Sequence, residues 1–251
     1  MRSSAVSRHY DALIDENNDS FHDSPELAAY MDKWDGQKLL DMLAPKAEQT
    51  VLEIGVGTGR LARRTAPLYQ SFTGIDLSEK TVERAKSNLA SFPNVTLYCG
   101  NFLTYPFEER FDTVYSSLTF MHIRQKQRAF EKVSTLLVPG GRFVLSIDKN
   151  TDKYLVCGDR TLALYPDTPN EIEKIALDVG FRITEKAVHH VSNLYDASMP
   201  YFMRLTDSGI GMHVGPVFQT PQSHGCIRMT RSSCVPLFKT VKVGTPVTIV
   251  Q

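Results

Sequence analysis

The stretch from Val51 to Leu61 constrains the fold of this 251-residue chain more than any other. It starts with an apolar run and continues into a turn that carries Gly55, Gly57 and Gly59. Glycine accepts positive φ and lets the backbone approach a ligand closely. The pattern predicts a buried strand, a tight turn and a helix that begins near residue 60. This arrangement either cradles a cofactor in a parallel α/β sheet or is a tight turn without a ligand.

Strand-like and helix-like segments alternate after this turn. The sequence predicts strands at 50–54, 71–76, 95–99, 111–116 and 142–147, and helices at 60–68, 79–89 and 125–137. Such alternation predicts an α/β fold, a parallel sheet with helices on both faces. Residues 1–48 are expected to form an N-terminal helical lid. Ser24 and Pro25 begin one of its helices, and Tyr10, Tyr30 or Trp34 would contact a substrate or only pack against the sheet.

Polar and aromatic side chains follow the first three predicted strands. Glu53 precedes the glycines and could order the loop or bind an amino group. Asp76 ends the second strand, where it could bind ribose hydroxyls or cap the next helix. Asn101 and Phe102 follow the third strand, where an amide can pair with a base edge and an aromatic ring can stack or join the core. Together these positions indicate a nucleoside ligand at the carboxyl edge of the sheet.

Residues 51–59 resemble the first motif of class I S-adenosylmethionine-dependent methyltransferases. Asp76 matches the ribose-binding acid of that family, residues 100–102 match its adenine-contacting segment, and residues 137–143 match its turn into strand five. The resemblance covers about residues 10–190. It implies a Rossmann-like, doubly wound and mostly parallel sheet, with a methyltransferase domain at 49–192. It also implies S-adenosylmethionine as cofactor, bound by Glu53, Gly55, Gly57, Gly59, Asp76, Asn101 and Phe102.

A nicotinamide dehydrogenase is the rival interpretation of the turn, but its G-x-G-x-x-G fingerprint differs from the spacing here. Methyl transfer is an in-line displacement in which the protein positions the acceptor and can remove its proton. Near the end of the fourth strand, Tyr115, Ser116, Ser117 and His122 are candidates for this role. His122 is the preferred base because of its usual pKa, although it could equally be a packing residue. We expect a small-molecule acceptor.

The last fifty residues carry a second cluster of reactive side chains. Cys226 could be a thiolate nucleophile with His213 as its base, and Arg228 could lower the thiol pKa or hold a substrate carboxylate. A metal site formed by His213, His224 and Cys226 is the weaker alternative, because no regular ligand spacing follows, and we expect no metal. These side chains could also simply lie in a loop.

Residues 223–228 resemble the catalytic signature of YkuD-type L,D-transpeptidases, with His213 and residues 244–247 at matching places. This resemblance implies Cys226 as the acyl-forming nucleophile, His213 as general base, Arg228 as a substrate-contacting or site-ordering residue, and a peptidoglycan stem peptide as partner. It covers only part of such a domain, at 199–251, expected as a small β-rich segment. The chain therefore resembles a fusion, whether natural, recombined or artificial. The tail is either an active transpeptidase segment or a structural remnant, and Tyr201–Leu205 could supply the last strand of the methyltransferase sheet.

Charge and composition restrict the partners. Lys plus Arg and Asp plus Glu both number 28, so no basic bias favours nucleic acid. No stretch is long enough to span a bilayer, the first ten residues lack the apolar run of a signal peptide, and the four cysteines are scattered. We therefore expect a cytoplasmic protein with no membrane partner.

Overall fold

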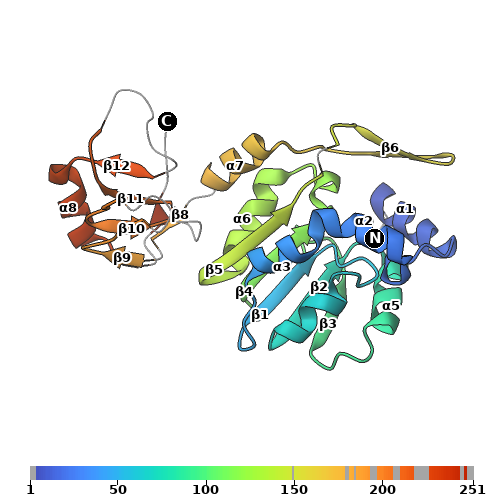
Figure 1. The fold of residues 1–251 in the computed structure, drawn as a ribbon. Helices are drawn as coiled ribbons and strands as arrows, with labels where there is room; N and C mark the ends of the chain where they lie inside the picture. Colours follow the sequence, from blue (N-terminus) through green and yellow to red (C-terminus); the bar gives the residue numbers. More distant parts are fainter. Residues whose placement is uncertain are drawn as a thin grey trace. The chain divides into compact units, whose positions relative to one another are not determined.

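The computed structural model describes residues 4–148, 150–178, 181–183, 185–192, 197–205, 210–217, 226–243 and 246–247 (Figure 1). The chain divides into two compact units, Met1–Ile175 and Ala176–Gln251, and each is considered by itself. The helices and strands of the first unit are α1 (Ala5–Asp15), η1 (Ser20–His22), α2 (Pro25–Asp35), α3 (Gln37–Leu43), β1 (Thr50–Ile54), α4 (Ala62–Thr65), η2 (Ala66–Leu68), β2 (Ser71–Asp76), α5 (Glu79–Asn88), β3 (Val95–Cys99), β4 (Phe111–Ser117), η3 (Phe120–His122), α6 (Lys126–Leu136), β5 (Leu137–Ser146), β6 (Tyr154–Cys157) and β7 (Arg160–Ala163).

The first unit is built on a five-stranded sheet in the order β3-β2-β1-β4-β5, with every neighbouring pair parallel. The order reverses between β1 and β4, so the chain leaves these two strands in opposite directions. Open α/β sheets bind ligands beyond the carboxyl ends of the strands at such a switch point. The predicted Rossmann-like, parallel α/β fold is confirmed.

Helices cover this sheet and share its core. The α5 helix packs against β2 and β3, and α6 packs against β4 and β5. Val51, Phe72 and Tyr115 of the strands are fully buried with Leu43 of α3. Burying each such side chain contributes about 1.5–3 kcal/mol of transfer free energy.

The helix after the glycine turn is shorter than the sequence predicts. The pattern predicts one helix over residues 60–68, but α4 has four residues and continues as the 3₁₀ turn η2. Pro67 lies in η2 and lacks the N–H that would continue the hydrogen bonds of an α-helix. The other helix starts follow the sequence signals, because Ser24 and Ser78 cap α2 and α5 by accepting from Leu27 N and Thr81 N.

Within its described residues, the second unit has a four-stranded sheet, a two-stranded pair and the helix α8 (Arg231–Thr240). Its elements, with the helix α7 (Pro169–Asp178) that leads into it, are β8 (Phe181–Arg182), β9 (Glu185–Ala187), β10 (Phe202–Arg204), β11 (Gly211–Val214), β12 (Ile227–Met229), α8 (Arg231–Thr240) and β13 (Pro246–Val247). The sheet order is β12-β11-β10-β9, and β13 pairs with β8. Ile183, Met203, Leu205, Met212 and Cys234 form its buried core.

Two expectations about this region are wrong. The stretch 201–205 does not extend the methyltransferase sheet, because β10 within it pairs with β9 and β11. The tail also contains the helix α8, where only short strands were expected. Its apolar residues at 234, 237, 238 and 241 recur at helical spacing, but Pro236 obscures the pattern.

The boundary between the two compact units, after Ile175, lies before the domain boundary that the sequence places at 192–199. Residues 193–196 lie outside the described residues, so the partition into 49–192 and 199–251 stays a prediction. Within the part of the chain that the structure describes, no helix has the length and apolar content needed to cross a bilayer.

Candidate functional site

The three positions after β1 differ in why they require glycine. All have positive φ, at 79° for Gly55, 56° for Gly57 and 96° for Gly59. A Cβ added to Gly55 would lie 2.1 Å from Thr119 Oγ1, and one added to Gly59 would lie 2.9 Å from Leu89 Cδ1. A Cβ on Gly57 would meet nothing within 4 Å. Packing therefore requires glycine at the outer positions, while Gly57 is required by its backbone conformation alone.

Asp76 is joined to this turn by backbone hydrogen bonds. Gly57 N donates to its Oδ2 and Ser78 N donates to its Oδ1, both at 3.0 Å. Burial raises the pKa of Asp76, and the two backbone N–H groups oppose that rise. The carboxylate thus holds the glycine turn and the start of α5 together, and its oxygens keep lone pairs for a ligand.

Glu53 lies almost fully buried at the end of β1. Its Oε2 accepts a hydrogen bond of 2.8 Å from Tyr115 Oη, which lies 2.9 Å from Thr65 Oγ1. Burial raises the pKa of Glu53 to about 8, against the opposing effects of the Tyr115 hydrogen bond and the Arg60 charge. The sequence suggests Tyr115 as an acceptor-side residue, but its side chain is fully buried against Glu53.

The two predicted adenine-contacting residues after β3 are one polar and one apolar side chain. Asn101 is exposed, and its Oδ1 accepts from Leu103 N at 2.9 Å, which leaves its amide nitrogen available. Phe102 is 6% exposed and packs near Phe107.

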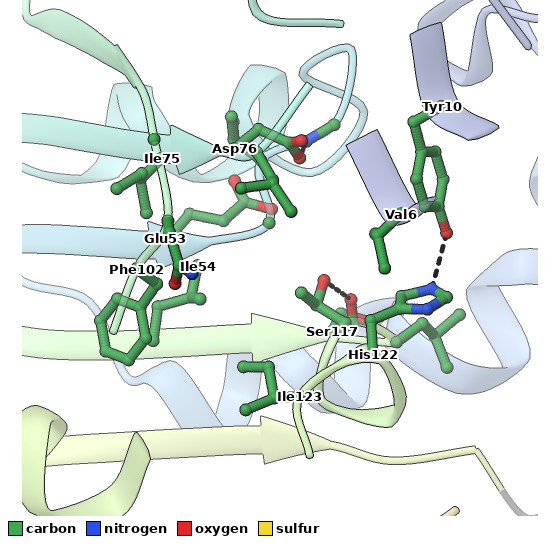
Figure 2. Close-up of a pocket in the computed structure, with 18 of the residues that line it drawn as sticks. Val6, Tyr10, Glu53, Ile54, Ile75, Asp76, Phe102, Ser117, His122 and Ile123 are labelled. Atoms are coloured by element: carbon green, nitrogen blue, oxygen red, sulfur yellow. Dashed lines mark hydrogen bonds between the residues drawn. The ribbon is translucent and has the colours of Figure 1, made fainter. Parts of the chain in front are cut away.

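These residues line one cavity of about 550 Å³ in the first unit, which is within the size range of small-molecule sites. Of the predicted cofactor residues, all but Gly59 line it: Glu53, Gly55, Gly57, Asp76, Asn101 and Phe102. Figure 2 shows Glu53, Asp76 and Phe102 on one side and Tyr10 with His122 on the other. From the N-terminal part of the chain, the cavity is lined by Val6 and Tyr10 of α1, its N-cap residue Ser4, Ser20 of η1 and Met31 of α2. Covering a bound ligand as a lid stays a predicted role of residues 1–48.

Tyr10 and His122 form a hydrogen-bonded pair at this second side. Tyr10 Oη lies 2.8 Å from His122 Nε2. Burial raises the pKa of Tyr10 to about 12 and lowers that of His122 to about 4, so both are uncharged at neutral pH. Of the other acceptor-side candidates, Ser117 lines the cavity, whereas Ser116 is buried and donates to Ile54 O. Tyr30 is exposed, and the Trp34 side chain lies outside the described part of the structure.

A buried ion pair that sequence reasoning missed supports the site. Arg60 lines the cavity, and its two terminal nitrogens donate to the carboxylate of Asp35 at 2.9 and 2.5 Å. Ser117 Oγ donates to the same carboxylate at 2.8 Å. These bonds tie the end of α2 to the glycine turn and to the end of β4. In the sequence, the position of Arg60 directly after Gly59 was the only indication that this arginine belongs to the site.

In the second unit, His213 and Arg228 are register partners on the parallel strands β11 and β12. A Cβ added to Gly215 would lie 3.4 Å from His213 Cε1 and 3.3 Å from Arg228 Cδ, so both side chains border one point. His213 is buried, and its Nδ1 donates to Val214 O at 2.9 Å, which leaves Nε2 as the lone-pair nitrogen. Burial lowers the pKa of His213, and the Arg228 charge adds to that effect.

Cys226 directly precedes β12. Its Sγ lies 4.0 Å from Met199 Sδ, and the side chain is partly buried. His224, the third ligand of the alternative metal site, lies outside the described residues. Among the residues that are described, no group of three His, Cys, Asp or Glu side chains could hold a metal ion.

Comparison with known protein families gives one match for each of the two resemblances found in the sequence. A family described as a methyltransferase domain matches residues 51–141, and the L,D-transpeptidase catalytic domain matches residues 116–249. The two matches overlap at 116–141, and the structure places that stretch in the parallel sheet and helix α6 of the first unit.

Similar proteins are methyltransferases. An uncharacterized methyltransferase of Anoxybacillus flavithermus is 37% identical over 47% of this chain and 56% of its own length. One of Geobacillus sp. (strain WCH70) is 30% identical over 56% of this chain and 68% of its own length. The structure of DhpI in complex with SAH matches with a TM-score of 0.57 at 19% identity, over 80% of this chain and 98% of that one, and so shows a shared fold. The chain spans about half to two thirds of the curated relatives that it matches.

The sheet order, the glycine turn and these relatives define a class I methyltransferase. The chain belongs to that family through its N-terminal part, and its C-terminal part belongs to the YkuD-type L,D-transpeptidase catalytic family. The family's cofactor is S-adenosylmethionine, and the cavity fits it, because Gly57 leaves open space beside the carboxylate of Asp76.

Proposed function

We propose that this chain transfers the methyl group of S-adenosylmethionine to a small-molecule acceptor. The observation that carries the proposal is the cavity in which the predicted cofactor residues face the Tyr10–His122 pair. Asp76 would bind the ribose, Asn101 and Phe102 the adenine, and Glu53 the methionine amino group. When bound, the cofactor supplies an electrophilic methyl group on a sulfonium.

The role of this chain's own residues is to hold the two reactants in line and to exclude water. His122 is the candidate base at the acceptor side. Its lowered pKa keeps it neutral at neutral pH, and its Nε2 already lies 2.8 Å from Tyr10 Oη, so it would position the acceptor and take up a proton only weakly.

Calorimetric titration with S-adenosylhomocysteine tests the proposal. We expect binding to the intact protein, and a loss of about tenfold or more in affinity for Asp76→Ala, because a charge-assisted hydrogen bond is removed. The control Asp15→Ala removes a carboxylate from an exposed pair with Lys80 and should bind like the unaltered protein. A folded protein that binds no S-adenosylhomocysteine would exclude this function.

A second candidate activity belongs to the tail. His213 with its hydrogen fixed on Nδ1, its strand neighbour Arg228, and Cys226 directly before the strand that carries Arg228 support an L,D-transpeptidase-like segment that acts on a peptidoglycan stem peptide. Cys226 would form the acyl-enzyme, with His213 as base and Arg228 as a substrate contact. This substrate lies outside the cytoplasm, whereas the methyl donor favours a cytoplasmic location.

Intact-protein mass spectrometry after incubation with a carbapenem tests this second activity. We expect one adduct in the unaltered protein and in Cys99→Ser, whose removed thiol is exposed, but none in Cys226→Ser. An unmodified folded protein with an ordinary thiol titre after denaturation would favour the structural-remnant interpretation of the tail.

A further inference from the structure

The acidic and basic side chains that line the methyltransferase cavity differ in whether they have hydrogen-bond or ion-pair partners. Asp76 accepts from two backbone N–H groups, Glu53 accepts from Tyr115, and Arg60 is paired with Asp35. Arg124 also lines the cavity and is exposed. It has neither an ion pair nor a hydrogen bond with any residue that the structure describes. The cavity therefore keeps one positive charge available for a ligand.

A second polar atom of the cavity wall, on the residue two positions before Arg124, also has no hydrogen-bond partner among the described residues. His122 Nδ1 is buried and makes no hydrogen bond within the described part of the chain. Tyr10 keeps its proton, and we assign its hydroxyl as the donor to His122 Nε2, which puts the imidazole hydrogen on Nδ1. A buried donor without an acceptor costs free energy, so this site favours a ligand that brings an acceptor oxygen.

The remaining wall on this side is apolar or uncharged. Val6, Met31 and Ile123 contribute apolar surface, and the Tyr10–His122 pair is neutral. Within the described residues, this side thus has one cation, one unpaired donor and no group that readily accepts a proton at neutral pH. Amines, phenols and thiols are largely protonated at neutral pH and need a base before they attack, whereas a carboxylate, with a pKa near 4, does not.

We propose that the methyl acceptor is a carboxylic acid with an apolar body, whose carboxylate is held by Arg124 and the Tyr10–His122 pair. This inference rests on the proposed methyl transfer. A guanidinium binds a carboxylate by charge-assisted hydrogen bonds, and one oxygen held in this way leaves the other free to attack.

The step balances without a further reactant. The free carboxylate oxygen forms the new bond to the methyl carbon, the bond between that carbon and the cofactor's sulfur breaks, and its electron pair stays on sulfur. The products are a methyl ester and S-adenosylhomocysteine, and no proton is transferred. An anion and a cation become neutral in this step, so surroundings of the reacting atoms that are less polar than bulk water favour it.

Calorimetry on the full chain saturated with S-adenosylhomocysteine tests the inference with three matched probe sets. These are octanoate, octan-1-ol and octylamine; phenylacetate, 2-phenylethanol and phenethylamine; and benzoate, benzyl alcohol and benzylamine. We expect at least one carboxylate to bind about tenfold or more tightly than its matched alcohol and amine. Arg124→Leu should lose about tenfold of that affinity, and Arg124→Lys should lose less. The control Arg128→Leu, whose side chain lies outside the cavity lining, should behave like the unaltered protein.

A second measurement identifies the product. With S-adenosylmethionine labelled in its methyl group, a methyl ester releases labelled methanol in mild alkali, whereas N-methyl and ether products do not. Carboxylates that bind no better than alcohols, alkali-stable products or an Arg124→Leu variant with unchanged carboxylate affinity would each overturn the inference. So would a loss of S-adenosylhomocysteine affinity in Arg124→Leu, because Arg124 would then serve the cofactor. In each case, if the unaltered protein still binds S-adenosylhomocysteine, the proposal of methyl transfer is not contradicted.

Discussion

The carboxylate of Asp35 accepts hydrogen bonds from both terminal nitrogens of Arg60, at 2.9 and 2.5 Å, and from Ser117. Asp35 is fully buried and the Arg60 side chain is 16% exposed. The pair lies where α2, the glycine turn and the end of β4 meet. It therefore connects the N-terminal helices to the strands that carry the cavity.

Removing Asp35 should be costly. We expect Asp35→Ala to lower the free energy of unfolding by about 3–5 kcal/mol, because the guanidinium of Arg60 would stay buried without its partner. Asp32→Ala is the matched control from the same helix, since Asp32 forms an exposed pair with Arg64, and it should cost less than about 1 kcal/mol. Urea unfolding measures both, and equal losses would contradict the prediction.

Glu53 should make the ligand-free protein less stable as pH rises. Its pKa is raised by burial from 4.5 to about 8, so between these values the folded state binds more protons than the unfolded state. The free energy of unfolding then falls with rising pH across this window, by at most about 1.4 kcal/mol for each step of one in pH. Glu53→Gln should remove this slope, whereas the exposed control Glu83→Gln should keep it. Chemical unfolding at several pH values from 5 to 9 provides the comparison, and a Glu53→Gln slope like that of the unaltered protein would refute the assignment.

Gly55 and Gly57 should respond differently to alanine. Both have positive φ, which costs a residue with a Cβ about 1–2 kcal/mol. Only at Gly55 does the new Cβ collide with a neighbour, the side chain of Thr119. We expect Gly55→Ala to lower the melting temperature more than Gly57→Ala does. Adding Thr119→Ala to Gly55→Ala should recover part of the loss, and the absence of any recovery would point to a different cause.

The Tyr10–His122 pair should contribute as a unit. Tyr10→Phe leaves His122 Nε2 buried without its partner, which should cost about 1–3 kcal/mol of unfolding free energy. The double variant Tyr10→Phe/His122→Phe should cost less than the sum of the single variants, because they remove the same hydrogen bond. Tyr154→Phe is the exposed control and should be neutral. Strict additivity in urea unfolding would argue against this hydrogen bond.

Local patterns in the sequence located the five strands of the methyltransferase sheet, although β5 begins at Leu137 and not at the predicted residue 142. Strand and helix periodicity, together with glycine spacing, led to strands 50–54, 71–76 and 95–99 with the bounds that the structure has. These patterns work because a buried strand and a capped helix are decided by residues close in the chain. They failed at α8, where Pro236 obscures a helical face, and after Gly59, where Pro67 shortens the helix.

The sequence by itself determined the parallel α/β class, the two family resemblances and the residues at the strand ends. Only the tertiary structure decided that Tyr115 supports Glu53, that Asp35 pairs with Arg60, and that Tyr10 meets His122. Each of these contacts joins residues between 25 and 112 positions apart. Such contacts depend on how whole elements pack, and no local periodicity encodes them. The site around the glycine turn shows the same division. The spacing of its glycines indicated a cofactor, whereas the tertiary contacts of the surrounding acidic and basic residues indicate which acceptor the cavity suits.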